Sequence, residues 1–352
     1  MQTLLLGISV VLVLVILFMI FKLTTLIGVA KGSKTDVDAG SNKVNASLML
    51  IFLIVSGIIT LWFSYSWFGD YHLPVASDHG VITDKLFWIT MGITGVAFVL
   101  TQILLFYFAF RYSYKKNSTA TYYPDNHKLE LVWTLVPAVV LTVLILYGLK
   151  VWNNITSPAP QEAEVIEVMG AQFAWRVRYP GEDNKLGRYD YRKIDASNAF
   201  GMDLSDKNSL DDFVPRELHL PKGKPVLLKI RARDVLHSVF LPHFRLKMDA
   251  VPGMPTQFWF VPSKSTEDMR KETGNPDFNY ELACTEICGK GHFSMRMLVV
   301  VDEPADYEAW KKEQKTWLSL NPEYMSQVPE ELKEVAMISS GIETSESKDS
   351  SL

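Results

Sequence analysis

The first 150 residues consist mainly of long apolar runs that contain no charged residue. Four of these runs reach the length of roughly 18 residues that a membrane-spanning helix needs, because about 20 helical residues cross the hydrocarbon core of a bilayer. Only a helix keeps the backbone groups of such a run paired in lipid, so the pattern predicts four transmembrane helices. The runs are Leu4–Phe21, Val44–Gly69, Leu86–Phe110 and Leu131–Leu149.

The connecting segments predict the orientation of these helices. Segments 31–43 and 111–128 carry three and four basic residues, whereas segment 70–85 carries one base and three aspartates. Since lysine and arginine favour the cytoplasmic side, both termini are expected outside. Everything after residue 150 then faces the periplasm or the cell exterior.

The first apolar run has an alternative interpretation as a signal peptide. Gly28-Val29-Ala30 forms a small-x-small pattern that resembles a cleavage site. Against cleavage, no basic residue precedes the run, and Lys22 lies before the site. The N-terminus of the mature protein decides whether residues 1–30 are removed.

After Trp152 the pattern changes to short segments in which apolar and polar residues alternate. Such segments, separated by Pro and Gly, predict a small β-sandwich or barrel. The strand candidates are 175–179, 218–220, 226–230, 258–261 and 297–301.

Four further segments of this half have polar or helical patterns. Segments 182–214 and 262–279 are polar and are expected to be loop insertions, and residues 305–318, after Pro304, read as a single helix. From Ser319 onward the chain is rich in Ser and Glu, which predicts a mobile tail.

Composition and charge support a membrane protein with a water-soluble second half. The 352 residues are 48% hydrophobic and carry a net charge of −4, which divides into +3 over residues 1–150 and −7 after them. Most of that acidity lies beyond residue 318, so it is poor grounds for steering a cationic partner. The absence of a large basic patch argues against nucleic acid. Two cysteines in one short motif exclude a disulfide scaffold.

The motif with the clearest chemistry is Cys284–Met295, written C-x-E-x-C-x3-H-x2-M. Its thiols, imidazole and thioether favour copper or zinc over hard cations. A zinc site would use four strong ligands and no thioether, and a single-copper blue site would use one Cys. Because two thiolates can each bridge two ions, a dinuclear copper centre is the most economical interpretation.

A dinuclear centre needs a second imidazole. His237 is the best candidate, because it follows the strand pattern 226–232 and a loop at a strand end is where a rigid sandwich presents ligands. His243 remains a nearby competitor.

Four blocks of the chain resemble subunit II of haem–copper cytochrome c oxidase, in the order of that family. The resembling region runs from residue 86 to 318, which is about two-thirds of the chain. The four blocks within it are 130–137, 234–238, 246–253 and 284–295. The resemblance implies that the β-domain is a cupredoxin-like sandwich. The expected fold class is therefore a membrane α-helical part with four transmembrane helices plus an all-β cupredoxin-like sandwich.

The resemblance also implies a division into domains. The family commonly has two membrane helices, so the first two runs are extra. The expected parts are an additional N-terminal helix pair (1–84), the transmembrane hairpin typical of the family (85–152), a periplasmic copper domain (153–318) and a polar C-terminal tail (319–352).

For the metal site, the resemblance implies the two-copper centre called CuA. Cys284 and Cys288 would bridge both copper ions. One ion would add His237 and Met295, and the other His292 and the backbone carbonyl of Glu286. The Glu286 side chain would help to hold a magnesium ion shared with subunit I.

Other residues are carried over by the same resemblance. Glu130 matches the mouth of a proton pathway into subunit I, although it could be a plain carboxylate at the membrane boundary. Lys247 and Asp249 match a pair that faces subunit I, or could form an ordinary surface ion pair.

The chain departs from the family where electrons are accepted. Phe173 stands at the position of the family's tryptophan, and Arg178 replaces the acidic docking residue that follows. Trp175 could accept electrons instead, but the interpretation as a core aromatic is favoured. Arg176 and Arg178 suggest a docking surface unlike that of mitochondrial relatives. The extra helices could dock the donor or simply pack in membrane lipid.

The resemblance implies a respiratory function in the inner membrane of a bacterium. The chain would take electrons from cytochrome c, or from a haem c domain of a partner complex, and pass them to haem a in subunit I. Oxygen is reduced there with proton pumping, and subunit III would be a further partner. The chain contains no Cys-x-x-Cys-His, so haems are expected in subunit I only.

The alternative function is a membrane-tethered copper chaperone with a Cys-x3-Cys and a distant His. Chaperones of that kind have a thioredoxin-like βαβ core and usually Pro after the second Cys. Here Gly289 follows, which disfavours the alternative.

Overall fold

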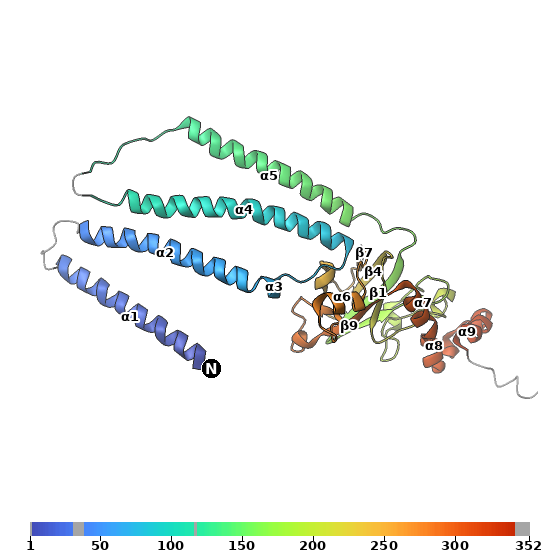
Figure 1. Cartoon of the computed structure of the whole chain (residues 1–352). Coiled ribbons are helices and arrows are strands. Elements are labelled where there is room, and N and C mark those ends of the chain that lie inside the picture. The colour runs from blue at the N-terminus through green and yellow to red at the C-terminus, as the bar shows by residue number, and fades with distance from the viewer. Residues whose placement is uncertain (1, 31–38, 116–117, 342–352) are drawn as a thin grey trace, which may run out of the picture. The chain divides into compact units, whose positions relative to one another are not determined.

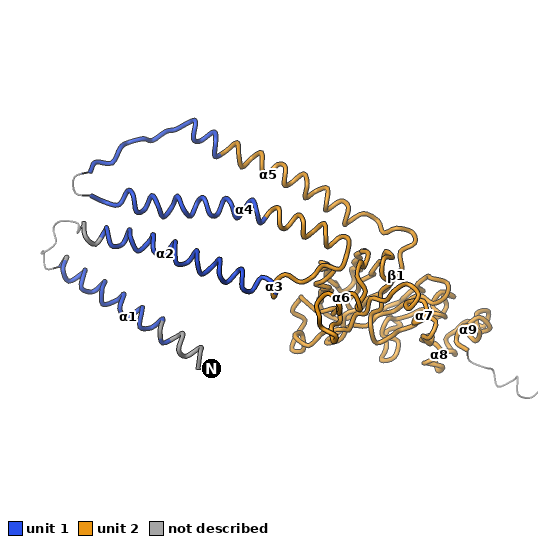
Figure 2. The backbone as a smooth tube through the Cα atoms, viewed as in Figure 1, with its two compact units in different colours: residues 1–69, 91–133 blue, residues 70–90, 134–352 orange. Residues whose placement is uncertain are grey.

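The computed structural model describes residues 2–30, 39–115 and 118–341. It divides into two compact units, residues 1–69 with 91–133 and residues 70–90 with 134–352 (Figure 2). Residues 31–38 and 116–117 of the basic segments discussed above lie outside the described part, as does the end of the expected tail, 342–352.

Long apolar helices occupy the N-terminal part of the chain (Figure 1). Within the described residues, four helices are long and apolar enough to cross a membrane, and almost none of the residues in their most apolar stretches are buried inside the protein, as contact with lipid requires. This confirms the four expected helices. They are α1 Gln2–Ala30, α2 Ala39–Ser66, α4 Asp78–Arg111 and α5 His127–Ile155, with the short α3 Phe68–Tyr71 between α2 and α4.

Within the described residues, the second half of the chain folds as two β-sheets. One has the strand order β2-β1-β4-β7 and the other β3-β9-β8-β5-β6. Residues at alternate positions of both sheets, such as Val168, Leu228 and Leu282, are fully buried in one core, so the domain is a sandwich. The strands are β1 Glu164–Ala171, β2 Ala174–Arg178, β3 Leu218–Pro221, β4 Val226–Ala232, β5 His237–Leu241, β6 Leu246–Ala250, β7 Thr256–Phe260, β8 Tyr280–Cys284 and β9 Arg296–Asp302.

The five strand candidates are confirmed as β2, β3, β4, β7 and β9, whereas β1, β5, β6 and β8 were not anticipated. The physical reason is visible in β1 and β5, where polar residues occupy buried positions. Glu167 in β1 and His237 and Ser238 in β5 are almost completely buried. Their alternation of polar and apolar residues therefore does not match the alternation of exposed and buried ones.

The polar insertion 182–214 contains no strand and only the short turns η1 Tyr191–Lys193 and η2 Lys207–Ser209. Three of its apolar side chains, Phe200, Met202 and Leu210, are nevertheless buried in a second apolar cluster. The other predicted insertion, 262–279, contains the helix α6 Thr266–Thr273. A capping box between Ser265 and Asp268 caps the N-terminus of this helix.

The C-terminal region departs from two expectations. The single helix expected over 305–318 is two helices, α7 Pro304–Glu313 and α8 Trp317–Leu320, because Thr316 caps a new helix by accepting from the Ser319 N–H. The expectation of a mobile tail is wrong for residues 319–341. Tyr324, Val328 and Ala336 are buried in the second apolar cluster, against the insertion. The elements there are η5 Pro322–Gln327, η6 Glu330–Leu332 and α9 Lys333–Ser340.

A buried group of charges joins the insertion to the outer face of the sheet β2-β1-β4-β7. The Arg178 guanidinium donates to Glu167 at 2.6 Å and to Asp212 at 2.9 Å, and Arg231 also donates to Glu167. Arg178 is only 2% exposed. The expectation that Arg178 belongs to a docking surface is therefore wrong, because the insertion covers it and its guanidinium donates to Glu167 and Asp212. Burial raises the pKa of Asp212 to about 8, and the positive charge of Arg178 opposes this rise.

We expect Arg178→Met to lower the free energy of unfolding by about 3–5 kcal/mol, because it leaves buried carboxylates without their partner. Arg176→Met is the matched control: Arg176 lies on the same strand but is exposed, so its replacement should change stability by less than about 0.5 kcal/mol. Denaturant unfolding of the full-length chain in detergent, followed by tryptophan fluorescence, measures both. Equal effects of the two substitutions would contradict a stabilising role of the buried charges.

Candidate metal centre

The candidate metal centre lies where strands β5 and β8 meet. The two strands pair in antiparallel register with Val239 opposite Cys284, which brings His237 and Cys284 close together across 47 residues of sequence. His237 is the first residue of β5 rather than part of a loop, which corrects the expected position. After the motif the chain returns along β9, which pairs with β8. Next to this pairing the Cys284 N–H donates to the Met295 carbonyl at 3.1 Å, so Met295 lies beside Cys284. Residues 285–295 between β8 and β9 are named the ligand loop below.

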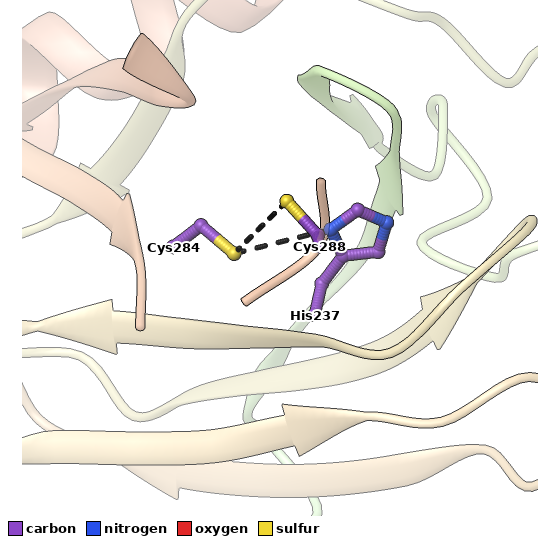
Figure 3. Close-up of side chains that lie close together, drawn as sticks. All are labelled: His237, Cys284 and Cys288. Atoms are coloured by element: carbon purple, nitrogen blue, oxygen red, sulfur yellow. Dashed lines mark hydrogen bonds between the residues drawn. The ribbon is translucent and has the colours of Figure 1, made fainter. Parts of the chain in front are cut away.

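Five further donor atoms lie close to the Cys284 sulfur or its immediate neighbour, four of them from the ligand loop and one from His237 on β5. Cys284 Sγ lies 3.9 Å from Cys288 Sγ and 3.9 Å from His237 Nδ1 (Figure 3). It also lies 3.3 Å from the Glu286 carbonyl oxygen. Cys288 Sγ in turn lies 3.6 Å from His292 Nδ1 and 3.8 Å from Met295 Sδ. The two sulfur atoms thus form the middle of a six-donor set.

The surrounding residues fix the orientation of the His237 ring. Its Nε2 lies 2.9 Å from Asp234 Oδ1, which leaves Nδ1 directed toward Cys284. Such a carboxylate commonly sets the tautomer of a metal-binding imidazole. Gly170 of β1 makes room for the ring, because a Cβ at that position would come within 2.9 Å of the imidazole.

The carboxylate of Asp234 is held in its charged form. Partial burial acts to raise its pKa, but hydrogen bonds from the Gln172 N–H and the His237 ring outweigh this and lower it. Sequence reasoning placed Asp234 in a motif without giving it a role. The available signal was an acidic residue three positions before a candidate ligand.

The Cys288 thiol is poorly suited to being charged without a bound cation. Burial, together with the neighbouring Cys284 sulfur, raises the pKa of the Cys288 thiol to about 11. Cys284, Cys288 and Met295 are all buried, and His237 is fully inaccessible. A soft, buried donor set of this kind fits a thiophilic metal ion and offers nothing to a hard cation.

Comparisons with known proteins cover both the membrane helices and the β-domain. The family described as cytochrome c oxidase subunit II, periplasmic domain, matches residues 164–302, and the transmembrane domain of the same subunit matches residues 67–151. The alternative cytochrome c oxidase subunit 2 of Bradyrhizobium diazoefficiens is 36% identical over 282 residues, covering 78% of this chain and 94% of the relative. The chain belongs to the cytochrome c oxidase subunit II family.

Two further similarities are more distant. Cytochrome c oxidase subunit 2 of Thermostichus vulcanus is 26% identical over 294 residues, covering 75% of this chain and 85% of that protein. Among solved structures, the periplasmic domain of subunit II (CoxB) of Bradyrhizobium japonicum shares 23% identity with a TM-score of 0.31. That match covers 44% of this chain and 95% of the solved chain.

Membership of the subunit II family confirms the expected fold class of membrane helices plus a cupredoxin sandwich. The protein is a multi-pass membrane protein with a periplasmic domain and is a subunit of a cytochrome c oxidase complex. The copper-chaperone alternative is wrong, because the described part of the second half is a β-sandwich without the thioredoxin-like core that a chaperone requires.

The two aromatic residues proposed for electron acceptance have different surroundings. Trp175 is buried in the core, with its ring centre 5.9 Å from that of His237. Phe173 is 39% exposed, and its ring packs against Gly289 and Gly291 of the ligand loop. The surface position therefore belongs to Phe173, and the interpretation of Trp175 as a core aromatic agrees with its burial.

The remaining candidates lie away from the sulfur atoms. His243 lies in the turn η3 Pro242–Phe244 with its ring edge-on to Phe278 and Tyr280, so the structure brings His237 to the cysteines and not His243. Lys247 and Asp249 on β6 form an exposed ion pair at 3.0 Å.

Glu130 lies in the first turn of α5. Its side chain is 45% exposed, and its Oε2 lies 3.3 Å from His127 Nδ1. It is in the compact unit that does not contain the metal centre.

We expect metal affinity to fall as the pH is lowered. At neutral pH the raised pKa of the Cys288 thiol keeps it protonated, so metal binding must release that proton. The apparent affinity should drop at least about tenfold per pH unit between roughly pH 9 and pH 7, where ordinary imidazoles are neutral. Competition against a chelator of known affinity measures the slope, and a pH-independent affinity would contradict the raised pKa.

Proposed function

We propose that this subunit II accepts single electrons at a dinuclear copper centre, CuA, and passes them to haem a in subunit I for the reduction of oxygen coupled to proton pumping. The observation that carries the proposal is the convergence of two cysteine sulfurs with two imidazoles, a thioether and a carbonyl oxygen at one buried position. For this function the protein would lie in the inner membrane of a bacterium. Its partners there would be subunits I and III.

In the proposed centre, Cys284 and Cys288 would be shared by the two copper ions. His237 and Met295 would complete the ligands of one ion, and His292 and the carbonyl of Glu286 those of the other. The copper pair would supply one-electron redox chemistry shared over two ions. The chain contributes a rigid cage, because His237 and Cys284 are placed by paired strands and a buried Met295 helps to exclude water.

A single zinc ion is the competing occupant of this site. Four strong ligands would satisfy zinc, namely both cysteines and both histidines. The close approach of Met295 Sδ to Cys288 Sγ, at 3.8 Å, favours the dinuclear copper centre, since zinc has no use for a thioether.

Electrons would reach the centre through the surface at Phe173. The exposed ring lies between solvent and the ligand loop, so a donor that covers it is separated from the centre by a single packed layer. The donor would be cytochrome c or a haem c domain of a partner complex.

On the side of subunit I, Glu286 would help to hold a magnesium ion, and Lys247 with Asp249 would face that subunit. Oxygen ligands suit magnesium. The Ser238 hydroxyl donates to the Asp249 carboxylate at 2.7 Å and so fixes its position on the surface proposed to face subunit I. This hydrogen bond, together with Lys247, lowers the pKa of Asp249.

We expect the full-length chain in detergent, loaded with copper, to be purple and to bind two copper ions. Its electron spin resonance should show one unpaired spin shared over both ions. The substitution His237→Asn should abolish this spectrum, whereas the matched control His243→Asn should retain it, since that ring packs on aromatic residues instead. A single zinc, or a blue one-copper spectrum, would contradict the proposal.

We propose further that Glu130 forms the mouth of a proton pathway into subunit I. Its carboxylate is partly exposed at the start of α5, beside His127, where it could take up protons from water.

The substitution Glu130→Gln should therefore slow oxygen consumption by the purified complex about tenfold or more, within the range that a positioned proton-transfer group contributes. The copper spectrum should stay intact. Asp125→Asn, which removes a neighbouring exposed carboxylate in the loop before α5, serves as the control and should leave turnover unchanged. Unchanged turnover in Glu130→Gln would return Glu130 to the role of a plain boundary carboxylate.

A further inference from the structure

The turn between β1 and β2 lies directly on the candidate metal centre. Ala171 pairs with Ala174, so Gln172 and Phe173 form the connection between the two strands. The backbone N–H of Gln172 donates to Asp234 Oδ2 at 2.8 Å, and the other oxygen of the same carboxylate holds His237. The turn and one imidazole ligand therefore share a single anchor.

The side chain of Gln172 reaches a second ligand. Its amide Nε2 donates to the Cys288 carbonyl oxygen at 2.5 Å, across 116 residues of sequence. Cys288 itself is buried, and its sulfur lies at the middle of the donor set. The amide thus places the positive end of a dipole beside the backbone of a bridging cysteine.

The glycines of the ligand loop allow this close approach. Gly289 has a φ of +132°, and a Cβ there would come within 2.9 Å of the Gln172 amide nitrogen and 3.0 Å of the Phe173 ring. A Cβ on Gly291 would come within 2.5 Å of the same ring. The turn therefore occupies the space that side chains at 289 and 291 would need. Glycine at these two positions lets the turn pack directly against the ligand loop.

We propose that Gln172 is a positioning residue that holds Cys288 in place and raises the reduction potential of the copper centre. This inference rests on the proposed function of the site. A donor to the Cys288 carbonyl withdraws electron density from the cysteine and stabilises the reduced, less positive state. Hydrogen bonds around metal ligands tune potentials in this way. Gln172 touches the ligand and not the metal, so its effect is on geometry and potential.

The test compares three variants of the full-length chain loaded with copper. Gln172→Met keeps the length of the side chain and removes the donor, and Gln172→Glu replaces the donor by a negative charge. Gln257→Met is the control, because Gln257 lies exposed on β7 of the same domain. Redox titration followed by the copper absorption gives the potential, spin resonance gives the coupling to both ions, and circular dichroism checks the fold.

At a fixed applied potential, the ratio of oxidised to reduced centre should rise about threefold in Gln172→Met and about tenfold in Gln172→Glu, the latter equal to about 59 mV for one electron. Copper loss with an intact fold in both variants also supports the proposal. If the wild-type chain shows the two-copper spectrum and Gln172→Met keeps its potential and couplings, the positioning role is wrong. If the wild-type chain lacks that spectrum, the proposed function fails first, and this inference with it.

Discussion

Two cysteine sulfur atoms lie 3.9 Å apart in the interior of the β-domain, and both are shielded from water. Burial opposes the charge that the Cys288 sulfur needs in order to bind a metal, and raises the pKa of that thiol. A metal ion would reverse this balance, because it would supply the positive charge that the interior lacks. The surrounding fold therefore has to keep the two sulfurs together when no cation is bound.

The sandwich meets this requirement with strand ends rather than with the loop alone. Cys284 is fixed by β8, His237 by the first residue of β5, and Met295 by its backbone bond to Cys284. Only residues 285–291 remain to be ordered, and they are held from outside by the β1–β2 turn. Three of the six donor positions are thus set by backbone hydrogen bonds of the strands, and the other three, on Glu286, Cys288 and His292, lie in the ligand loop. The donors fixed by strands are in place without a metal ion, so this part of the donor set has little need to move when one binds.

Sequence patterns predicted those parts of the molecule whose causes are local. The four membrane helices follow from uninterrupted apolar runs, and the donor set follows from one short motif plus His237 at the end of a strand pattern. The strands β1 and β5 were not predicted because Glu167 and His237 are buried against residues that lie far away in sequence, Arg231 beside Glu167 and Cys284 beside His237. Likewise, the apolar residues of 319–341 are too sparse to predict a core by themselves, and become one only against the insertion. The contact between Gln172 and Cys288 spans 116 residues and leaves no local signal.

Contacts between residues far apart in sequence also explain one difference from the family. Arg178, which stands where the family has an acidic residue, is buried and links the insertion to the sheet through its hydrogen bonds to Asp212 and Glu167. What remains exposed beside the centre is mainly apolar: Phe173 on the turn, and Ile287 and Phe293 on the ligand loop, which are 83% and 85% exposed. Large apolar side chains in this position are unfavourable in water and are expected where partner proteins cover them. Membership of an oxidase complex offers these side chains surroundings other than water. In this chain, Phe173, Ile287 and Phe293 make the surface beside the ligand loop partly apolar, while the arginine that would have made it more basic, Arg178, is buried beneath the insertion.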